Sequence, residues 1–147
     1  MNEDFASVRL KTNVVGAGQK ALKVRTVIYA PDGQSVVEKI FAGKTVDGQP
    51  LVQNFIVENP KLWSPESPFL YEAVSEIYAD GTLSDVYRTR FGIRSIEYIP
   101  EKGFFLNGQR RKFQGVCNHH DLGPLGAAVN ESALRHQLLL LKDMGCD

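Results

Sequence analysis

The residues of this chain whose types could do chemistry lie together between Gly115 and Gly126, in the sequence GVCNHHDLGPLG. Two adjacent histidines, His119 and His120, are followed at once by Asp121. Imidazole nitrogens and a carboxylate can hydrogen-bond a ligand or coordinate a metal ion. This glycine-bounded stretch is therefore the candidate functional site.

Three interpretations of this cluster stay open: contact with a ligand, a hydrogen-bonded loop, and a metal site. Adjacent residues of a strand point to opposite faces, so His119 and His120 could share one ion only in a loop conformation. Asp121 could orient either imidazole or simply cap the loop.

Two cysteines, Cys117 and Cys146, complete the reactive side chains. Two thiols make no disulfide framework and match no zinc spacing. A free cysteine behaves as a small hydrophobic residue, so we expect both to be buried free thiols. We favour this over a nucleophilic role for Cys117 beside His119.

The composition excludes several classes of function. Among 147 residues, Lys and Arg together number 17, as do Asp and Glu, so the formal charge is zero. A nucleic-acid surface normally shows a basic excess, and no apolar run approaches the ~20 residues of a membrane span. We expect neither a nucleic-acid nor a membrane partner. No signal segment opens the chain, so any export signal of the parent lies upstream of Met1, and its localisation stays open.

The first ~95 residues alternate apolar and polar side chains, which is typical of half-buried strands. Two turn signals separate such runs: Pro31-Asp32-Gly33, and Asp80-Gly81, a strong hairpin signal. The predicted strands are 7–15, 21–29, 36–41, 51–57, 69–79 and 82–91. This pattern predicts an antiparallel β-sandwich, without the cysteine pair of immunoglobulin domains.

The connection LWSPESPFLY over 62–71 contains prolines that cannot sit in a central strand. Its Trp63 could stack on a sugar or close one end of the sandwich. We favour the structural role, because the loop feeds directly into a strand and lacks polar neighbours suited to hydroxyl groups.

The pattern changes after residue 95. A short strand is predicted at 96–99, and a hairpin of 103–106 with 111–114 around Asn107-Gly108. A new strand at 115–118 then leads through the histidine cluster to a helix. Asn130 suits its N-cap, Leu134, Leu138 and Leu141 share one face, and Gly145 suits its end. A strand, loop and helix in this order are how a (β/α)8 barrel opens.

These residues closely resemble glycoside hydrolase family 2, the β-galactosidase and β-glucuronidase group. The motifs, in family order, are NPKLWSPESPFLY, FGIRSI, FFLNGQRRKFQGVCNHHDLGPLGAA and LKDMGC. The resemblance implies an immunoglobulin-like β-sandwich over residues 1–97. It further implies the N-terminal part of a TIM-barrel catalytic domain over residues 98–147. Among the activities of the family we expect β-galactosidase.

The resemblance also implies that the catalytic groups lie elsewhere. The family cleaves glycosidic bonds with retention, using two glutamates about 5 Å apart. Both are expected beyond Asp147, since Glu101 lies in the linker and Glu131 at the helix start. No residue of the chain is therefore predicted to be catalytic, and the chain alone is expected to be inactive.

For the histidine cluster, the resemblance implies substrate binding. His119 matches a family histidine that contacts the sugar, at the place where the first barrel strand ends. His120 departs from the family pattern, in which many members carry glutamate there. We expect His119 to line the sugar pocket, with His120 and Asp121 as further candidates for contact with the substrate.

The remaining expectations concern cofactors and partners. We expect no cofactor or metal site in these residues, and leave open whether the parent uses a metal ion. The parent should bind a carbohydrate substrate. The four leucines Leu138 to Leu141 predict that the helix packs on its own sandwich or on a second copy, as a homo-oligomer or a swapped contact. The alternative function is a non-catalytic carbohydrate-binding or protein-interaction module.

Overall fold

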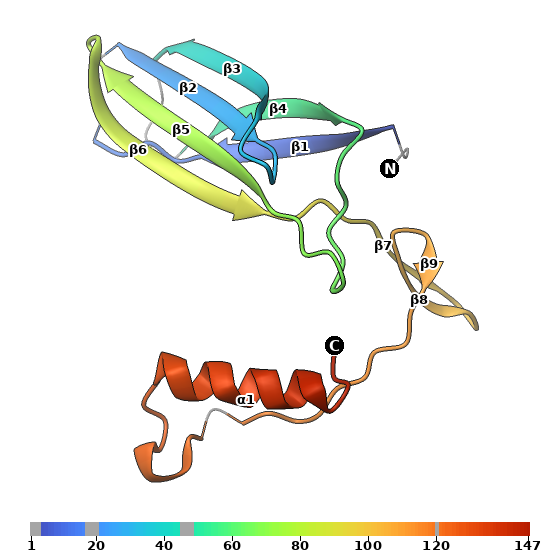
Figure 1. Cartoon of the computed structure of the whole chain (residues 1–147). Helices are drawn as coiled ribbons and strands as arrows, with labels where there is room; N and C mark the ends of the chain where they lie inside the picture. The colour runs from blue at the N-terminus through green and yellow to red at the C-terminus, as the bar shows by residue number, and fades with distance from the viewer. Residues whose placement is uncertain (1–3, 17–20, 45–48, 120) are drawn as a thin grey trace. The chain divides into compact units, whose positions relative to one another are not determined.

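The computed structural model describes residues 4–16, 21–44, 49–119 and 121–147 (Figure 1). The chain divides into two compact units, Met1–Ser95 and Ile96–Asp147. Strands dominate, as the sequence predicted, and they pair in antiparallel fashion wherever they meet in the described residues.

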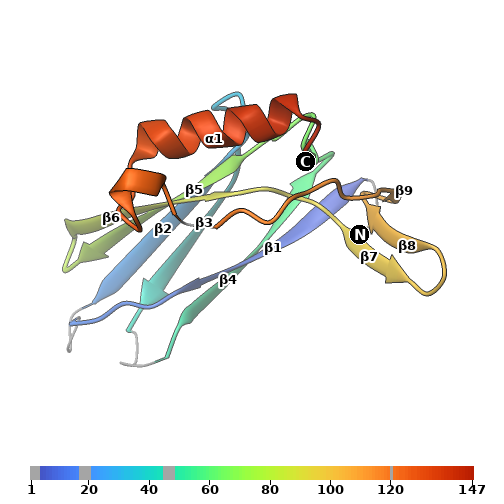
Figure 2. The ribbon, with the colours of Figure 1, turned by 90° about the horizontal axis from the view of Figure 1, so that it is seen from below.

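The first unit is a β-sandwich. One sheet pairs β1 (Phe5–Thr12) with β4 (Leu51–Glu58). The other has the order β3-β2-β5-β6, in which the strands are β3 (Ser35–Gly43), β2 (Leu22–Tyr29), β5 (Tyr71–Ala79) and β6 (Thr82–Phe91). The two sheets face each other in both ribbon views (Figures 1 and 2).

The core lies between the sheets because alternate side chains of each strand point inward. On β4 the alternation is complete: Gln53, Phe55 and Val57 are buried while their neighbours are exposed. Phe55 and Val57 pack with Ile28 and Ala73 from the facing sheet. This cross-sheet cluster confirms the predicted antiparallel sandwich.

A buried polar group interrupts the apolar core. The Thr26 hydroxyl donates to Gln53 Oε1 at 2.7 Å and lies 3.0 Å from Ser75 Oγ. All three side chains are buried, at 0%, 6% and 5% exposure. Because a buried polar atom without a partner costs free energy, these bonds also fix which residues of the two sheets face each other.

Both predicted turns of the sandwich form. At the β2–β3 turn, Gly33 has φ +83° and its N–H donates to Ala30 O at 2.9 Å. At the β5–β6 turn, Asp80 and Gly81 both have positive φ, +48° and +83°, as a primed hairpin turn requires.

The β5–β6 ladder then changes register. Tyr78 pairs with Leu83, but Ile77 pairs with Asp85, so Ser84 is left as an extra residue on β6. From Ile77 to Tyr71, each β5 residue therefore faces the β6 residue one position further along the chain than it would in a ladder without the bulge. Glu72, for example, pairs with Arg90. The bulge thereby decides which face of the sheet the β6 side chains occupy.

Trp63 is a packing residue of this unit. Its backbone N–H donates to Ile93 O at 2.7 Å, and the Arg94 guanidinium lies 4.9 Å from the centroid of the indole ring. A Cβ added at Gly92 would lie 3.0 Å from Trp63 Cβ. The indole is therefore seated on residues 92–94, which supports the structural interpretation over a free sugar-stacking platform.

The second unit begins with a small sheet of order β7-β8-β9. Its strands are β7 (Ile96–Ile99), β8 (Gly103–Leu106) and β9 (Gln109–Arg110). Asn107 and Gly108 have φ of +51° and +76°, which confirms the predicted hairpin turn. The outgoing strand was predicted too late, at 111–114. It begins earlier, at Gln109, where β9 pairs with β8 through Gln109 opposite Leu106 and Arg110 opposite Phe105.

The predicted strand at 115–118 is not formed as a strand. A strand needs a neighbour to accept and donate its backbone hydrogen bonds. The nearest such contact is one residue earlier, where Asp147 N–H donates to Gln114 O at 2.8 Å. The prediction of a strand here was wrong for this chain, because periodicity does not supply a ladder partner.

The helix α1 (Glu131–Asp143) has the predicted ends. Asn130 Oδ1 accepts from Ala133 N–H at 3.0 Å, which is an N-cap. At the other end Gly145 has φ +93° and donates to Lys142 O, and Cys146 donates to Leu141 O. This pair of bonds is a Schellman motif. None of the residues of α1 is buried, and no helix in the described part of the chain is long and apolar enough to cross a membrane.

Candidate functional site

The stretch from Gly115 to Gly126 lies between β9 and α1 and holds little regular structure. Its one short element is the 3₁₀ turn η1 (Gly123–Leu125). The His119 side chain is exposed and makes none of the hydrogen bonds found among the described residues. Its imidazole is thus open to a ligand, and no hydrogen bond from the described residues fixes its orientation.

Asp121 has a local partner. Its Oδ1 accepts from Gly123 N–H at 2.9 Å, two residues ahead, in the manner of an Asx turn. The loop is closed further by Leu122 N–H to Gly126 O and by Gly126 N–H to Gly123 O, each 2.9 Å. Of the roles considered for Asp121, capping the loop is the one that this geometry supports. His120 lies outside the described residues.

The metal interpretation gains no support from the geometry. No group of three His, Cys, Asp or Glu side chains arranged to hold an ion occurs among residues 4–16, 21–44, 49–119 and 121–147.

The thiols differ from the expectation. Both cysteines are free, as predicted, but Cys117 is exposed and Cys146 is only partly buried. The expectation of burial assumed that 115–118 would be a strand within a sheet. Because residues 115–118 do not form a strand, Val116 and Cys117 are both exposed, Val116 at 53%.

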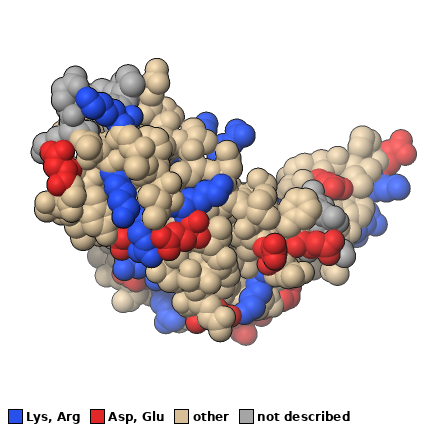
Figure 3. All heavy atoms as spheres, turned by 90° about the horizontal axis from the view of Figure 1, so that it is seen from above, with Lys and Arg blue, Asp and Glu red and all other residues tan. Residues whose placement is uncertain are grey.

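Two carboxylates of the sandwich, those of Glu38 and Glu76, form ion pairs with one arginine. On the outer face of the β3-β2-β5-β6 sheet, Arg25 contacts Glu38 at 2.8 Å and Glu76 at 3.1 Å. Figure 3 shows basic side chains beside acidic ones across the face that it draws. Tyr78 also donates to Glu76 Oε2 at 3.0 Å.

These contacts set the protonation of the two glutamates. Hydrogen bonds from Arg25 lower the pKa of Glu38, and those from Arg25 and then Tyr78 lower the pKa of Glu76. A general acid that works near neutral pH needs a raised pKa. Glu38 and Glu76 are thus unsuited to protonate a leaving group, and their place is in a surface ion-pair ladder.

The described residues form a β-sandwich, a small three-stranded sheet and a capped helix. A model of the family described as Glycosyl hydrolases family 2 matches residues 1–94, which is more than half of the 147 residues. The chain belongs to this family.

Individual relatives extend the likeness along the whole chain. A β-galactosidase of Bacteroides ovatus is 36% identical over 151 residues, covering 100% of this chain and 18% of that protein. A putative β-glucuronidase of Formosa agariphila is 40% identical over 126 residues, covering 86% and 12%. The chain therefore spans a fifth or less of the length of these curated relatives.

A solved structure agrees with the fold. The β-glucuronidase of Parabacteroides merdae matches with a TM-score of 0.88 and 26% identity, over 99% of this chain and 18% of that one. The names of the relatives are divided between β-galactosidase and β-glucuronidase. The comparisons thus establish the family and do not choose between the two sugars.

Proposed function

We propose that this chain is a non-catalytic part of a longer retaining hydrolase of β-glycosides and comprises its β-sandwich and the start of its catalytic barrel. The observation that carries the proposal is the match of the whole chain to 18% of a β-galactosidase. The arginine-held Glu38 and Glu76 support it, because their lowered pKa values do not suit an acid catalyst. The catalytic glutamate pair is then supplied by residues outside this chain.

The sandwich has a structural task in this proposal. Its buried cluster around Phe55 gives a stable body, proposed to span residues 1–97, to which the barrel of residues 98 onward is attached. The exposed imidazole of His119 forms part of the wall of the sugar pocket, where one nitrogen donates to a sugar oxygen or accepts from a hydroxyl. Asp121 holds the loop that presents it.

We take a β-galactoside as the first candidate substrate, since the Bacteroides ovatus relative, 36% identical over the full chain, is a β-galactosidase. A β-glucuronide is the second candidate, favoured by the Formosa agariphila and Parabacteroides merdae proteins. The two sugars differ in the configuration at C4 and in the group at C6, where the second carries a carboxylate, so one pair of assays separates them.

The first experiment compares this chain with the product of the full gene. Each is incubated with the 4-nitrophenyl β-galactoside and the 4-nitrophenyl β-glucuronide, and release of nitrophenolate is followed. We expect turnover by the full product and none by residues 1–147. Turnover by the short chain would refute the placement of the catalytic groups. A gene that encodes no further glutamate pair after Asp147 would favour an independent binding module.

The second experiment tests His119 in the full-length enzyme. Loss of one hydrogen bond to the sugar in His119→Ala should lower kcat/KM by roughly 5-fold, in keeping with a net bond worth about 1 kcal/mol. His136→Ala, an exposed histidine on α1, is the matched control and should leave kcat/KM unchanged. Equal activities of the two variants would remove His119 from the pocket.

A further inference from the structure

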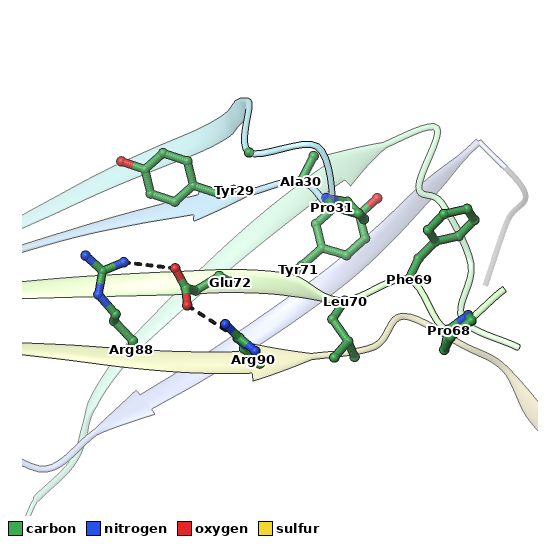
Figure 4. Close-up of a pocket in the computed structure, with 11 residues that line it drawn as sticks. Tyr29, Ala30, Pro31, Pro68, Phe69, Leu70, Tyr71, Glu72, Arg88 and Arg90 are labelled. Carbon is green, nitrogen blue, oxygen red and sulfur yellow. Dashed lines mark hydrogen bonds and ion pairs between the residues drawn. The ribbon is translucent and has the colours of Figure 1, made fainter. Parts of the chain in front are cut away.

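The outer face of the β3-β2-β5-β6 sheet ends in a groove of about 590 Å³ that no role proposed above uses. Figure 4 shows its walls, which come from the β2–β3 turn, the start of β5 and the end of β6. This groove, called the Arg90 groove, is lined by residues that include Tyr29, Phe69, Leu70, Glu72, Arg88 and Arg90.

The Arg90 groove holds two guanidinium groups and one carboxylate. Arg88 Nη1 lies 2.9 Å from Glu72 Oε2, a hydrogen-bonded ion pair. Arg90 Nε lies 3.7 Å from Glu72 Oε1, which is beyond hydrogen-bond reach. One positive charge is thus left over, and it resides mainly on Arg90, whose side chain is 76% exposed.

The bulge at Ser84 creates this arrangement. Arg88 and Arg90 are two positions apart on β6, so both side chains point to the same face, and the shifted register places Arg90 opposite Glu72. Arg90 keeps the planar pair of terminal N–H donors that matches a carboxylate in two parallel hydrogen bonds.

The rest of the groove is apolar and aromatic. Phe69 and Leu70 are 40% and 44% exposed, and Tyr29 is partly exposed across from the arginines (Figure 4). Pro31 and Pro68 stiffen its two loop walls. Rigid aromatic and apolar walls with a few placed polar groups are typical of small-ligand sites. Such walls suit the C–H face of a pyranose ring.

We propose that the Arg90 groove binds an acidic saccharide, with a uronate carboxylate on Arg90 and the pyranose ring between Tyr29 and Phe69. The charge complementarity selects the acid, and the aromatic walls select the sugar. Every residue of the groove belongs to the first unit, so the inference does not rest on the proposed role of His119.

The test uses the 147-residue chain and methyl β-D-glucuronide as the probe. Amide shifts in ¹H–¹⁵N spectra are followed as the probe is added, at low and at 0.5 M salt. We expect shifts at Ala30, Gly33, Leu70 and Glu72, with millimolar affinity that weakens in salt, because the exposed Arg90 is screened. Two controls are titrated in the same way: methyl β-D-glucoside, which lacks the carboxylate, and sodium acetate, which lacks the pyranose ring. Each should bind at least 10-fold more weakly than methyl β-D-glucuronide.

Three variants sharpen the test. Arg90→Gln should weaken binding about 10-fold, since it removes a charge-assisted pair of hydrogen bonds. Glu72→Gln should strengthen binding several-fold, because it removes the competing carboxylate. Arg9→Gln on the other sheet, where Arg9 bonds only Asn54 among the described residues, is the matched control and should bind as the parent chain does.

Several outcomes would overturn the inference. Acetate that binds as tightly as the glucuronide would show that the groove reads any carboxylate, such as an acidic side chain of a protein partner. Equal binding of the uncharged glucoside would remove the role of Arg90. Shifts that lie outside the groove, or none at 50 mM probe, would remove the site. The unaltered chain alone gives these results, so they hold even if a variant fails to fold.

Discussion

The two units of this chain are stabilised in different ways. Among the described residues, thirteen hydrophobic side chains are buried; twelve belong to Met1–Ser95 and only Leu106 to Ile96–Asp147. The first unit is held by packing between sheets. The second is held by a hairpin turn, two helix caps and the contact of Asp147 with Gln114.

This difference shows which features of the fold turns and caps determine and which depend on core packing. Turns and caps each contribute about 1 kcal/mol, enough to set where an element begins and ends. Burial of a large apolar side chain contributes about 1.5–3 kcal/mol, and a core sums many of them. We therefore expect cooperative unfolding of the sandwich and a weaker, more local transition in the second unit.

The largest expected effect is on the core. Phe55→Ala removes a fully buried ring between the sheets and should lower the free energy of unfolding by about 3–5 kcal/mol. Urea unfolding followed by fluorescence of Trp63, the one tryptophan of the chain, reports this unit. Ile56→Ala, on the opposite face and 52% exposed, is the control and should cost far less. Equal losses would contradict the sandwich core.

The polar group of the core should give the second effect. Thr26→Val keeps the shape of the side chain but leaves Gln53 Oε1 without its donor, and should cost about 1–3 kcal/mol. The same urea experiment measures it, beside Thr82→Val at an exposed position. Pairing Thr26→Val with Gln53→Leu should recover part of the loss; additive losses would show that the two side chains do not interact.

A cap variant addresses the second unit. Asn130→Ala removes the acceptor for Ala133 N–H and should destabilise α1 by about 1 kcal/mol. Amide exchange of 131–143 should accelerate, while that of the sandwich strands stays unchanged. Slower folding or faster exchange of β2 and β5 in this variant would mean that the two units do not behave as separate bodies.

The smallest effect is a pH dependence at Asp147. A hydrogen bond from Arg111, and then one from Gln114 N–H, lowers the pKa of Asp147 below its ordinary value. A carboxyl whose folded pKa is lowered stabilises above its unfolded pKa, and the contribution is lost as pH falls through the folded value. Carboxyl ¹³C titration should show this lowered pKa, with a return toward the ordinary value in Arg111→Gln. An unchanged titration in that variant would argue against the pair.

Much of the fold was predictable because its signals are local. Asp80-Gly81 and Asn107-Gly108 form the turns their residue types predict, and Asn130 and Gly145 bound the helix as expected. The strand at 115–118 was not predictable in this way, because apolar residues show only that a strand is favourable. Whether it forms depends on neighbours distant in sequence.

The histidine loop and the Arg90 groove differ in the same way in how far the sequence predicts them. His119 and Asp121 lie in one short loop, so their proximity can be predicted from the sequence alone. The Arg90 groove joins residues 29 to 90, and a plain two-residue hairpin would have placed Thr89 opposite Glu72. Only the extra residue Ser84 turns Arg88 and Arg90 to the face of Glu72.

By itself, then, the sequence determined the turns, the caps, the alternation of the strands and the family to which the chain belongs. The tertiary structure alone decided the register of β6, the burial of Thr26 with Gln53 and the exposure of Cys117. The physical reason is the range of the interactions. Backbone conformation follows from the residue and its neighbours, whereas pairing and burial depend on which distant segments the chain brings together.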